Sequence, residues 1–142
     1  MDNFKDTAYR VYQDVEILHK NSRWFNCCYL AGYIAECYCK LILNNAITSG
    51  FPVSQKEVRK YSHKIEAMHL DLEKIYATSH ILSKYCLDLR VSCSSILNEW
   101  DPKLRYEDNQ AAWNQQDAAD KYKQEVECLI EQIKIMQLDG VI

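Results

Sequence analysis

The sequence predicts an all-α fold, an up-and-down antiparallel bundle of four to five helices in one domain that spans residues 1–142. Three observations support this prediction. The 142 residues include only three glycines and two prolines, so helix breakers are rare. Apolar residues recur at spacings of three and four along most of the chain. The connections between these periodic stretches are short, which favours antiparallel neighbours.

The first periodic stretch predicts a helix from about Asp2 to Lys20. Its apolar residues form a single stripe, through Phe4, Ala8, Val11, Tyr12, Val15 and Leu18. Acidic Asp2 near the beginning and basic Lys20 near the end suit the helix dipole. Asn21 and Ser22 form the predicted turn, and Ser22 is a suitable N-cap for the next helix.

The second helix, from about Ser22 to Thr48, is apolar around most of its circumference. Such a helix lies at the centre of a bundle or crosses a membrane, but its uncharged run is shorter than the roughly 20 residues that a span needs. Polar and amphipathic residues step along one face, at Asn26, Tyr29, Tyr33, Glu36, Lys40 and Asn44. We predict a central helix with this narrow polar seam, in which Glu36 pairs with Lys40 four residues later. Gly32, beside the seam, is expected to let a neighbouring helix approach closely.

The second half begins after Gly50 and Pro52, which end the central helix. A capping-box sequence at residues 54–57 predicts a short helix. Two apolar stripes follow, the first through Ile65, Met68, Leu72, Ile75 and Tyr76, the second through Leu82, Tyr85, Cys86, Leu89, Cys93, Ile96, Leu97 and Trp100. No glycine or proline decides whether a loop near Ser79 and His80 separates them. Pro102 ends the second stripe.

Residues 101–113 are polar and charged, and we predict an irregular segment there. The last helix is predicted from about Gln115 to Leu138, and Gly140 follows as its stop. Its inward-facing residues are predicted to be Ala119, Tyr122, Val126, Leu129, Ile130, Ile133 and Met136.

Composition and charge exclude several classes of protein. A net charge of -3 argues against a generally cationic nucleic-acid binder, so DNA is not an expected partner. The seven cysteines lack a C-x-x-C spacing and predict reduced core residues in a cytoplasmic protein, without a disulfide framework or zinc site. No secretory signal is expected. Without a glycine-rich loop or matched His–carboxylate pairs on two helices, we expect no cofactor and no metal.

Three motifs in order carry a family resemblance. The second helix contains YLAGYIAECYCKLIL, residues 29–43, which is close to a pattern A-x-E-x-x-x-K. Residues 62–65 read SHKI, and residues 100–106 read WDPKLRY. Together they resemble HEPN domains (higher eukaryotes and prokaryotes nucleotide-binding), which have such a second helix, a His before helix three and an Arg-Tyr segment before the last helix.

The resemblance implies a helical bundle that is commonly a homodimer. Some members are metal-independent ribonucleases of toxin–antitoxin or defence systems, and others are non-catalytic partners of nucleotidyltransferases or binding modules. The ribonucleases use an Arg followed after four to six residues by a His, late in the fold. Here the histidines are His19, His63, His69 and His80, and none follows Trp100. The sequence therefore predicts no catalytic residue.

A small basic groove is a further prediction. If the segment from Lys56 to Lys64 is helical, its basic residues share one side and lie near Lys103 and Arg105. A tyrosine among Tyr106, Tyr29 and Tyr33 would stack a base. The candidate ligand-binding residues are Lys40, Arg59, His63, Arg105 and Tyr106.

Each of these features also has a structural interpretation. The charge run is then a solvated helix face, and His63 marks the start of a helix. Arg105 then caps carbonyl groups or pairs with Glu36, because a buried carboxylate needs a partner.

The function predicted from the sequence is a non-catalytic module that binds a nucleotide or RNA, or that partners a nucleotidyltransferase. Two alternatives stay open. One is a metal-independent ribonuclease with a rearranged site that uses Arg59, His63 or Arg105. The other is a purely structural dimerisation domain.

Overall fold

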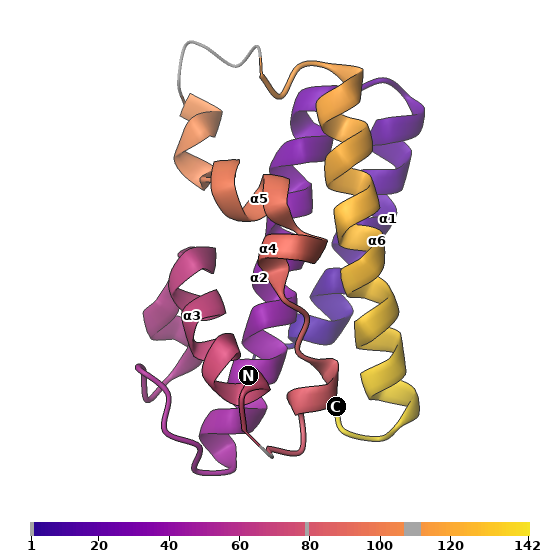
Figure 1. Cartoon of the computed structure of the whole chain (residues 1–142). Coiled ribbons are helices and arrows are strands. Elements are labelled where there is room, and N and C mark those ends of the chain that lie inside the picture. Colours follow the sequence, from indigo (N-terminus) through magenta and orange to yellow (C-terminus); the bar gives the residue numbers. More distant parts are fainter. Residues whose placement is uncertain (1, 79, 107–111) are drawn as a thin grey trace.

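The computed structural model describes residues 2–78, 80–106 and 112–142. Helices are the only regular secondary structure in this part of the chain, so the predicted all-α fold class is confirmed (Figure 1). The long helices α1 (Phe4–Lys20), α2 (Trp24–Thr48) and α6 (Gln116–Leu138) pack side by side. Three shorter helices lie on the remaining side of α2, namely α3 (Ile65–Tyr76), α4 (Leu89–Ser92) and α5 (Ser94–Glu99). Three 3₁₀ helices join them, η1 (Val58–Tyr61), η2 (Ser83–Tyr85) and η3 (Pro102–Tyr106).

Helix α2 is the central helix of the bundle, because it packs against α1, α6 and α3. The prediction that Ser22 caps it is wrong. Ser22 has a φ of 59°, and the Arg23 N–H donates to the Leu18 carbonyl. These are the features of a left-handed residue that closes the end of α1, so Ser22 belongs to the end of α1 and Arg23 precedes α2. Gly50, with a φ of 77°, follows the end of α2 as predicted.

Helix α6 agrees with the sequence prediction in its buried face as well as its length. All seven residues predicted to point inward are buried, namely Ala119, Tyr122, Val126, Leu129, Ile130, Ile133 and Met136. A continuous amphipathic helix without internal breakers leaves only one way to bury its apolar stripe.

The capping box predicted at residues 54–57 is wrong. The Ser54 backbone N–H and hydroxyl both donate to the Asp71 carboxylate of α3, and the segment forms only the short η1. Asp71 is 1% exposed and also accepts hydrogen bonds from the Tyr61 hydroxyl and the Lys74 ammonium. A buried carboxylate thus organises the segment, because it needs donors from every side.

The Asp71 carboxylate gives an expected pH dependence. Burial alone raises its pKa, but the hydrogen bonds from Ser54, Tyr61 and Lys74 outweigh burial and hold the pKa below the ordinary 3.8. A carboxyl group with a lowered folded-state pKa stabilises the fold above its unfolded-state pKa, and this stabilisation is lost as the pH falls through the folded-state value. We expect Asp71→Asn to reduce the free energy of unfolding by about 2 kcal/mol at pH 7. Urea unfolding at pH 3 to 7 checks this. The gap between the two proteins should narrow below about pH 4, and parallel curves would contradict the assignment.

The apolar stripe between residues 80 and 100 has the spacing of one continuous helix. In the structure this stretch instead forms three short helices, η2, α4 and α5. The Tyr38 hydroxyl of α2 donates to the Tyr85 carbonyl and accepts from the Leu87 N–H, so α2 satisfies the backbone between η2 and α4. The Glu125 carboxylate accepts from two N–H groups at the start of α5. Helix α3 ends at Tyr76. The sequence places Tyr76 in the apolar stripe of this helix, but its side chain is 65% exposed in the structure. Ser79 lies outside the described residues.

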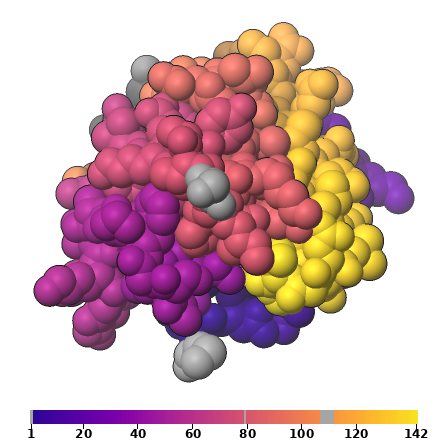
Figure 2. Space-filling model, turned by 60° about the horizontal axis from the view of Figure 1, so that its bottom comes forward, coloured from indigo at the N-terminus to yellow at the C-terminus, as the bar shows by residue number. Residues whose placement is uncertain are grey.

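Figure 2 looks at the end of the bundle, where the segment around η2 lies between the C-terminal part of α2 and that of α6. The Tyr85 hydroxyl of η2 donates to the Asp139 carboxylate just after α6. Six of the seven cysteines are buried free thiols, as predicted, whereas Cys128 is exposed. None of the helices in the described ranges is long and apolar enough to cross a membrane.

Candidate functional site

A buried carboxylate with two basic partners lies in the middle of the α2 seam. Glu36 accepts a hydrogen bond from the Lys40 Nζ at 2.6 Å, which confirms the predicted pair, and its second oxygen lies 2.8 Å from His63 Nδ1. Glu36 and Lys40 are 6% and 8% exposed, whereas half of the His63 side chain is exposed. A carboxylate only accepts, so His63 Nδ1 donates to Glu36, and Nε2 is the ring nitrogen that remains to meet a ligand.

A tryptophan packs against α2 one turn earlier. The Trp100 indole lies on Gly32, where a Cβ would come within 1.9 Å of the ring carbon Cε2. Its Nε1 donates to the Tyr29 carbonyl at 3.0 Å, and its ring meets the edge of Tyr33. The close approach predicted at Gly32 is therefore confirmed, but a side chain makes it rather than a helix. Tyr33 also touches the His63 ring, so Tyr33 lies between His63 and Trp100.

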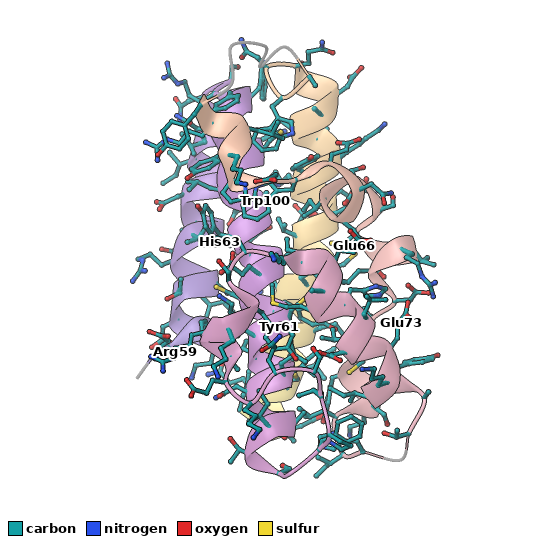
Figure 3. The ribbon with its side chains drawn as sticks, turned by 90° about the vertical axis from the view of Figure 1, so that its left-hand side faces the viewer. Arg59, Tyr61, His63, Glu66, Glu73 and Trp100 are labelled. Carbon is teal, nitrogen blue, oxygen red and sulfur yellow. The ribbon has the colours of Figure 1, made fainter. Side chains whose placement is uncertain are left out.

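These two anchors bound a groove of about 720 Å³, which we call the His63 groove. One wall is formed by residues 62–67 and Leu70, around the start of α3, and the other by residues 97–103, from α5 into η3. Three basic residues line it, His63, Lys64 and Lys103. Figure 3 shows His63 close to Trp100, with Glu66 and then Glu73 farther along. The groove thus joins two of the three sequence motifs, at residues 62–65 and 100–103, and both are anchored on the third motif in α2.

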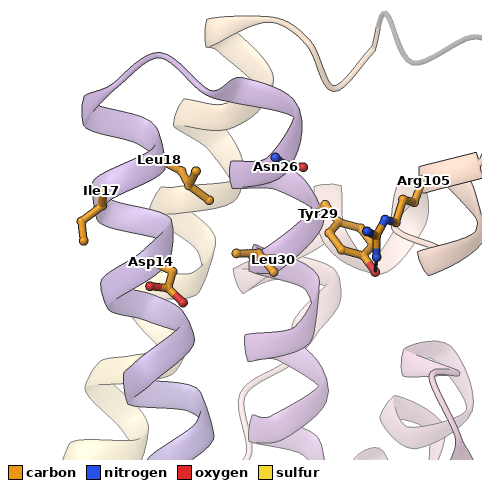
Figure 4. A pocket seen from close by; sticks show the side chains of 7 residues that line it. All are labelled: Asp14, Ile17, Leu18, Asn26, Tyr29, Leu30 and Arg105. Atoms are coloured by element: carbon orange, nitrogen blue, oxygen red, sulfur yellow. Dashed lines mark hydrogen bonds between the residues drawn. The ribbon is translucent and has the colours of Figure 1, made fainter.

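A second pocket, of about 460 Å³, lies between α1 and the beginning of α2 (Figure 4). Its walls are mostly apolar, with Ile17 and Leu18 from α1 and Leu30 from α2, and Arg105 closes one side. The Arg105 guanidinium stacks over the Tyr29 ring at 5.3 Å and donates to the Tyr29 hydroxyl at 3.5 Å.

The Tyr29 and Tyr33 hydroxyls lie 3.0 Å apart. The hydrogen bond from Tyr33 and the nearby Arg105 cation lower the pKa of Tyr29. Burial, followed by the hydrogen bond to Tyr29, raises the pKa of Tyr33. Either hydroxyl can be the donor in this pair.

The structure separates the predicted ligand-binding residues into four places. His63 lines the His63 groove, and Arg105 lines the second pocket. Lys40 lies beneath the surface with Glu36, as the predicted seam requires. Arg59 lies on η1, where it pairs with Glu57, and Tyr106 is 81% exposed at the end of η3 beside Arg105. Their roles in ligand binding stay predictions.

The shared basic side predicted for residues 56–64 does not form, because the segment is not an α-helix. A 3₁₀ helix of four residues at η1 and a φ of 53° at Ser62 point successive side chains in different directions. Of this charge run, only His63 and Lys64 line the groove. Lys103 joins them from η3, as predicted.

One cluster in the described ranges has the composition of a metal site. His69, Glu73 and Asp88 place ligand atoms within 4.8 Å of one another. However, His69 Nε2 accepts the Leu89 N–H at 3.2 Å. The Arg90 guanidinium lies 3.1 Å from Glu73 and 3.2 Å from Asp88. The guanidinium already balances the two carboxylates, so the cluster joins α3 to α4 as an ion-pair network.

Sequence reasoning missed the contact between Glu36 and His63 and the seat of Trp100. The first joins residues 27 apart through an irregular segment, which no periodicity describes. The second had a partial signal, since a glycine within a long apolar helix indicates close packing. Nothing in the pattern identified Trp100 as the partner.

Comparison of the chain with protein-family models, with curated proteins and with solved structures found no match. The fold and the His63 groove therefore carry the functional argument.

Proposed function

We propose that this protein is a non-catalytic binding module whose His63 groove takes a phosphate-bearing ligand, a nucleotide or an RNA. The observation that carries the proposal is the arrangement of His63, held from below by the buried Glu36, beside the two lysines of the groove. Imidazolium and ammonium groups make charge-assisted hydrogen bonds to phosphate oxygens. The resemblance to HEPN domains points to the same class of ligand.

The start of α3 adds to this positive field. The residue before α3, Lys64, makes no side-chain hydrogen bond to cap the helix, and the first-turn residues Glu66 and Ala67 line the groove. The first N–H groups of a helix carry partial positive charge and favour an anion. This contribution supplements the three basic side chains.

The non-catalytic part of the proposal rests on the placement of the basic residues. Metal-independent cleavage of RNA needs a proton-transferring group together with a cation on the developing phosphorane charge. Arg105 stacks on Tyr29 and lines the second pocket, whereas His63 lines the groove on the other side of the Tyr29–Tyr33 pair. The cation and the proton-transferring group therefore line different cavities, which supports a binding role without catalysis.

Fluorescence anisotropy with labelled ATP and labelled RNA tests the proposal. We expect the double variant Lys64→Ala, Lys103→Ala to weaken binding roughly tenfold, about 1.4 kcal/mol, because two phosphate contacts are lost. The double variant Lys56→Ala, Lys60→Ala is the matched control, since it removes the same two positive charges from exposed positions outside the groove. RNA incubated with excess protein in EDTA should stay intact.

Three outcomes would count against the proposal. Absence of binding to both ligands, or equal weakening by the control and by the Lys64→Ala, Lys103→Ala variant, would refute the groove as the binding site. Cleavage of RNA in EDTA that depends on His63 would instead support the ribonuclease alternative.

A further inference from the structure

The His63 groove has acidic residues beside its basic ones. Glu66 follows His63 and Lys64 on the α3 wall, and Glu99 and Asp101 precede Lys103 on the opposite wall. Glu99 accepts a hydrogen bond from the Tyr122 hydroxyl, and Asp101 accepts the backbone N–H of Lys103. Glu66 therefore faces the groove with no such hydrogen bond among the described residues.

The groove continues along α3 into a smaller depression of about 350 Å³. The two share Glu66, Leu70, Leu97 and Asn98. Glu73 and Arg90 line the continuation and pair with each other at 3.1 Å. An RNA strand that runs along α3, away from the end of the groove with His63, Lys64 and Lys103, must pass the Glu66 carboxylate. Beyond Glu66 it meets Arg90, which is already paired with Glu73.

This distribution of charge separates two kinds of phosphate. An internal phosphodiester carries one negative charge and is followed by another along the strand, which would lie against Glu66. A terminal phosphate monoester carries about −1.5 to −2 charges at neutral pH and three acceptor oxygens. Three basic side chains at one end of the groove match such a group, and a doubly protonated His63 donates to Glu36 from Nδ1 and to a phosphate oxygen from Nε2.

From this arrangement we infer, on the basis of the proposed function, that the groove recognises a terminal phosphate monoester, whether on a mononucleotide or on a phosphorylated RNA end. The phosphate lies among His63, Lys64 and Lys103. Glu66 repels a strand that continues along α3, so internal RNA segments bind more weakly than a terminal phosphate.

Binding of three internally labelled RNA decamers of the same sequence tests this inference. One carries a 5′-phosphate, one a 3′-phosphate, and one has hydroxyl groups at both ends. We expect a phosphorylated decamer to bind about tenfold more tightly than the hydroxyl-ended one. AMP should compete with it, and adenosine should not. Competition by AMP with equal binding of all three decamers would assign the groove to mononucleotides and refute recognition of an RNA end.

Two variants give the inference a second test. Lys64→Ala should weaken binding of the phosphorylated decamer by a larger factor than it weakens binding of the hydroxyl-ended one. Glu66→Gln should strengthen binding of the hydroxyl-ended decamer roughly threefold, whereas the control Glu57→Gln, at an exposed acid just before η1, should not. Thermal melting establishes that each variant is folded.

The two proposals fail in different ways. Equal binding of all three decamers, with adenosine competing as well as AMP, would overturn the inference and leave the binding function standing. Absence of binding to every decamer and to AMP would overturn both.

Discussion

Glu36→Gln is expected to lower the free energy of unfolding by about 3 kcal/mol, because it leaves the buried Lys40 ammonium without a counter-charge. Lys40 is 8% exposed and lies over the Phe4 ring, so it cannot reach water without disturbing α1. The same substitution weakens the hold on His63 Nδ1, so ligand affinity should also fall, though by less than stability does. Urea unfolding and nucleotide binding measure the two effects.

The double variant Glu36→Gln, Lys40→Met provides the control for this assignment. Removing both charges of a buried pair while keeping their volume is far less destabilising than removing one. We expect the double variant to recover most of the lost stability but not the ligand affinity, because His63 Nδ1 still lacks the carboxylate that held it. Unchanged melting of Glu36→Gln together with lost affinity would show that Glu36 serves the ligand alone.

Gly32→Ala is expected to lower the free energy of unfolding by about 2 kcal/mol. Alanine favours a helix by about 1 kcal/mol over glycine, but here its Cβ would lie within 1.9 Å of the Trp100 ring. The indole must leave its seat, which also breaks the hydrogen bond from Nε1 to the Tyr29 carbonyl. Thermal melting measures the stability, and nucleotide affinity should fall because Trp100 is part of one groove wall.

A double-mutant cycle separates this clash from other effects of the substitution. In a Trp100→Ala background the Cβ at position 32 meets no ring, so Gly32→Ala should become neutral or stabilising there. An equal loss of stability in both backgrounds would place the strain within α2 itself.

The sequence predicts the two longest helices, α2 and α6, well because their apolar periodicity is continuous and every inward position supports the same arrangement. It predicts the region from residue 51 to residue 100 less well. There the backbone is held by single side chains from distant elements, namely Asp71 for the segment at Ser54 and Tyr38 for the segment at Leu87. Such contacts have no local periodicity, so the capping box at residues 54–57 was indistinguishable from a real one.

The candidate site was predicted only in part, for the same physical reason. Glu36 and Lys40 are four residues apart on one helix, so their pairing follows from helical geometry. The position of His63 depends on the irregular path between α2 and α3, and that of Arg105 on η3. The homodimer and the nucleotidyltransferase partner stay predictions.

Both walls of the His63 groove are fixed to the same helix. His63 is hydrogen-bonded to Glu36 and Trp100 to the Tyr29 carbonyl, so two positions seven apart on α2 set the distance between the walls. Helix α2 is rigid and packed on several sides, and the groove therefore exists at its full width before a ligand arrives. Binding then loses little conformational entropy in the protein, so weak contacts to a small ligand are enough for measurable affinity.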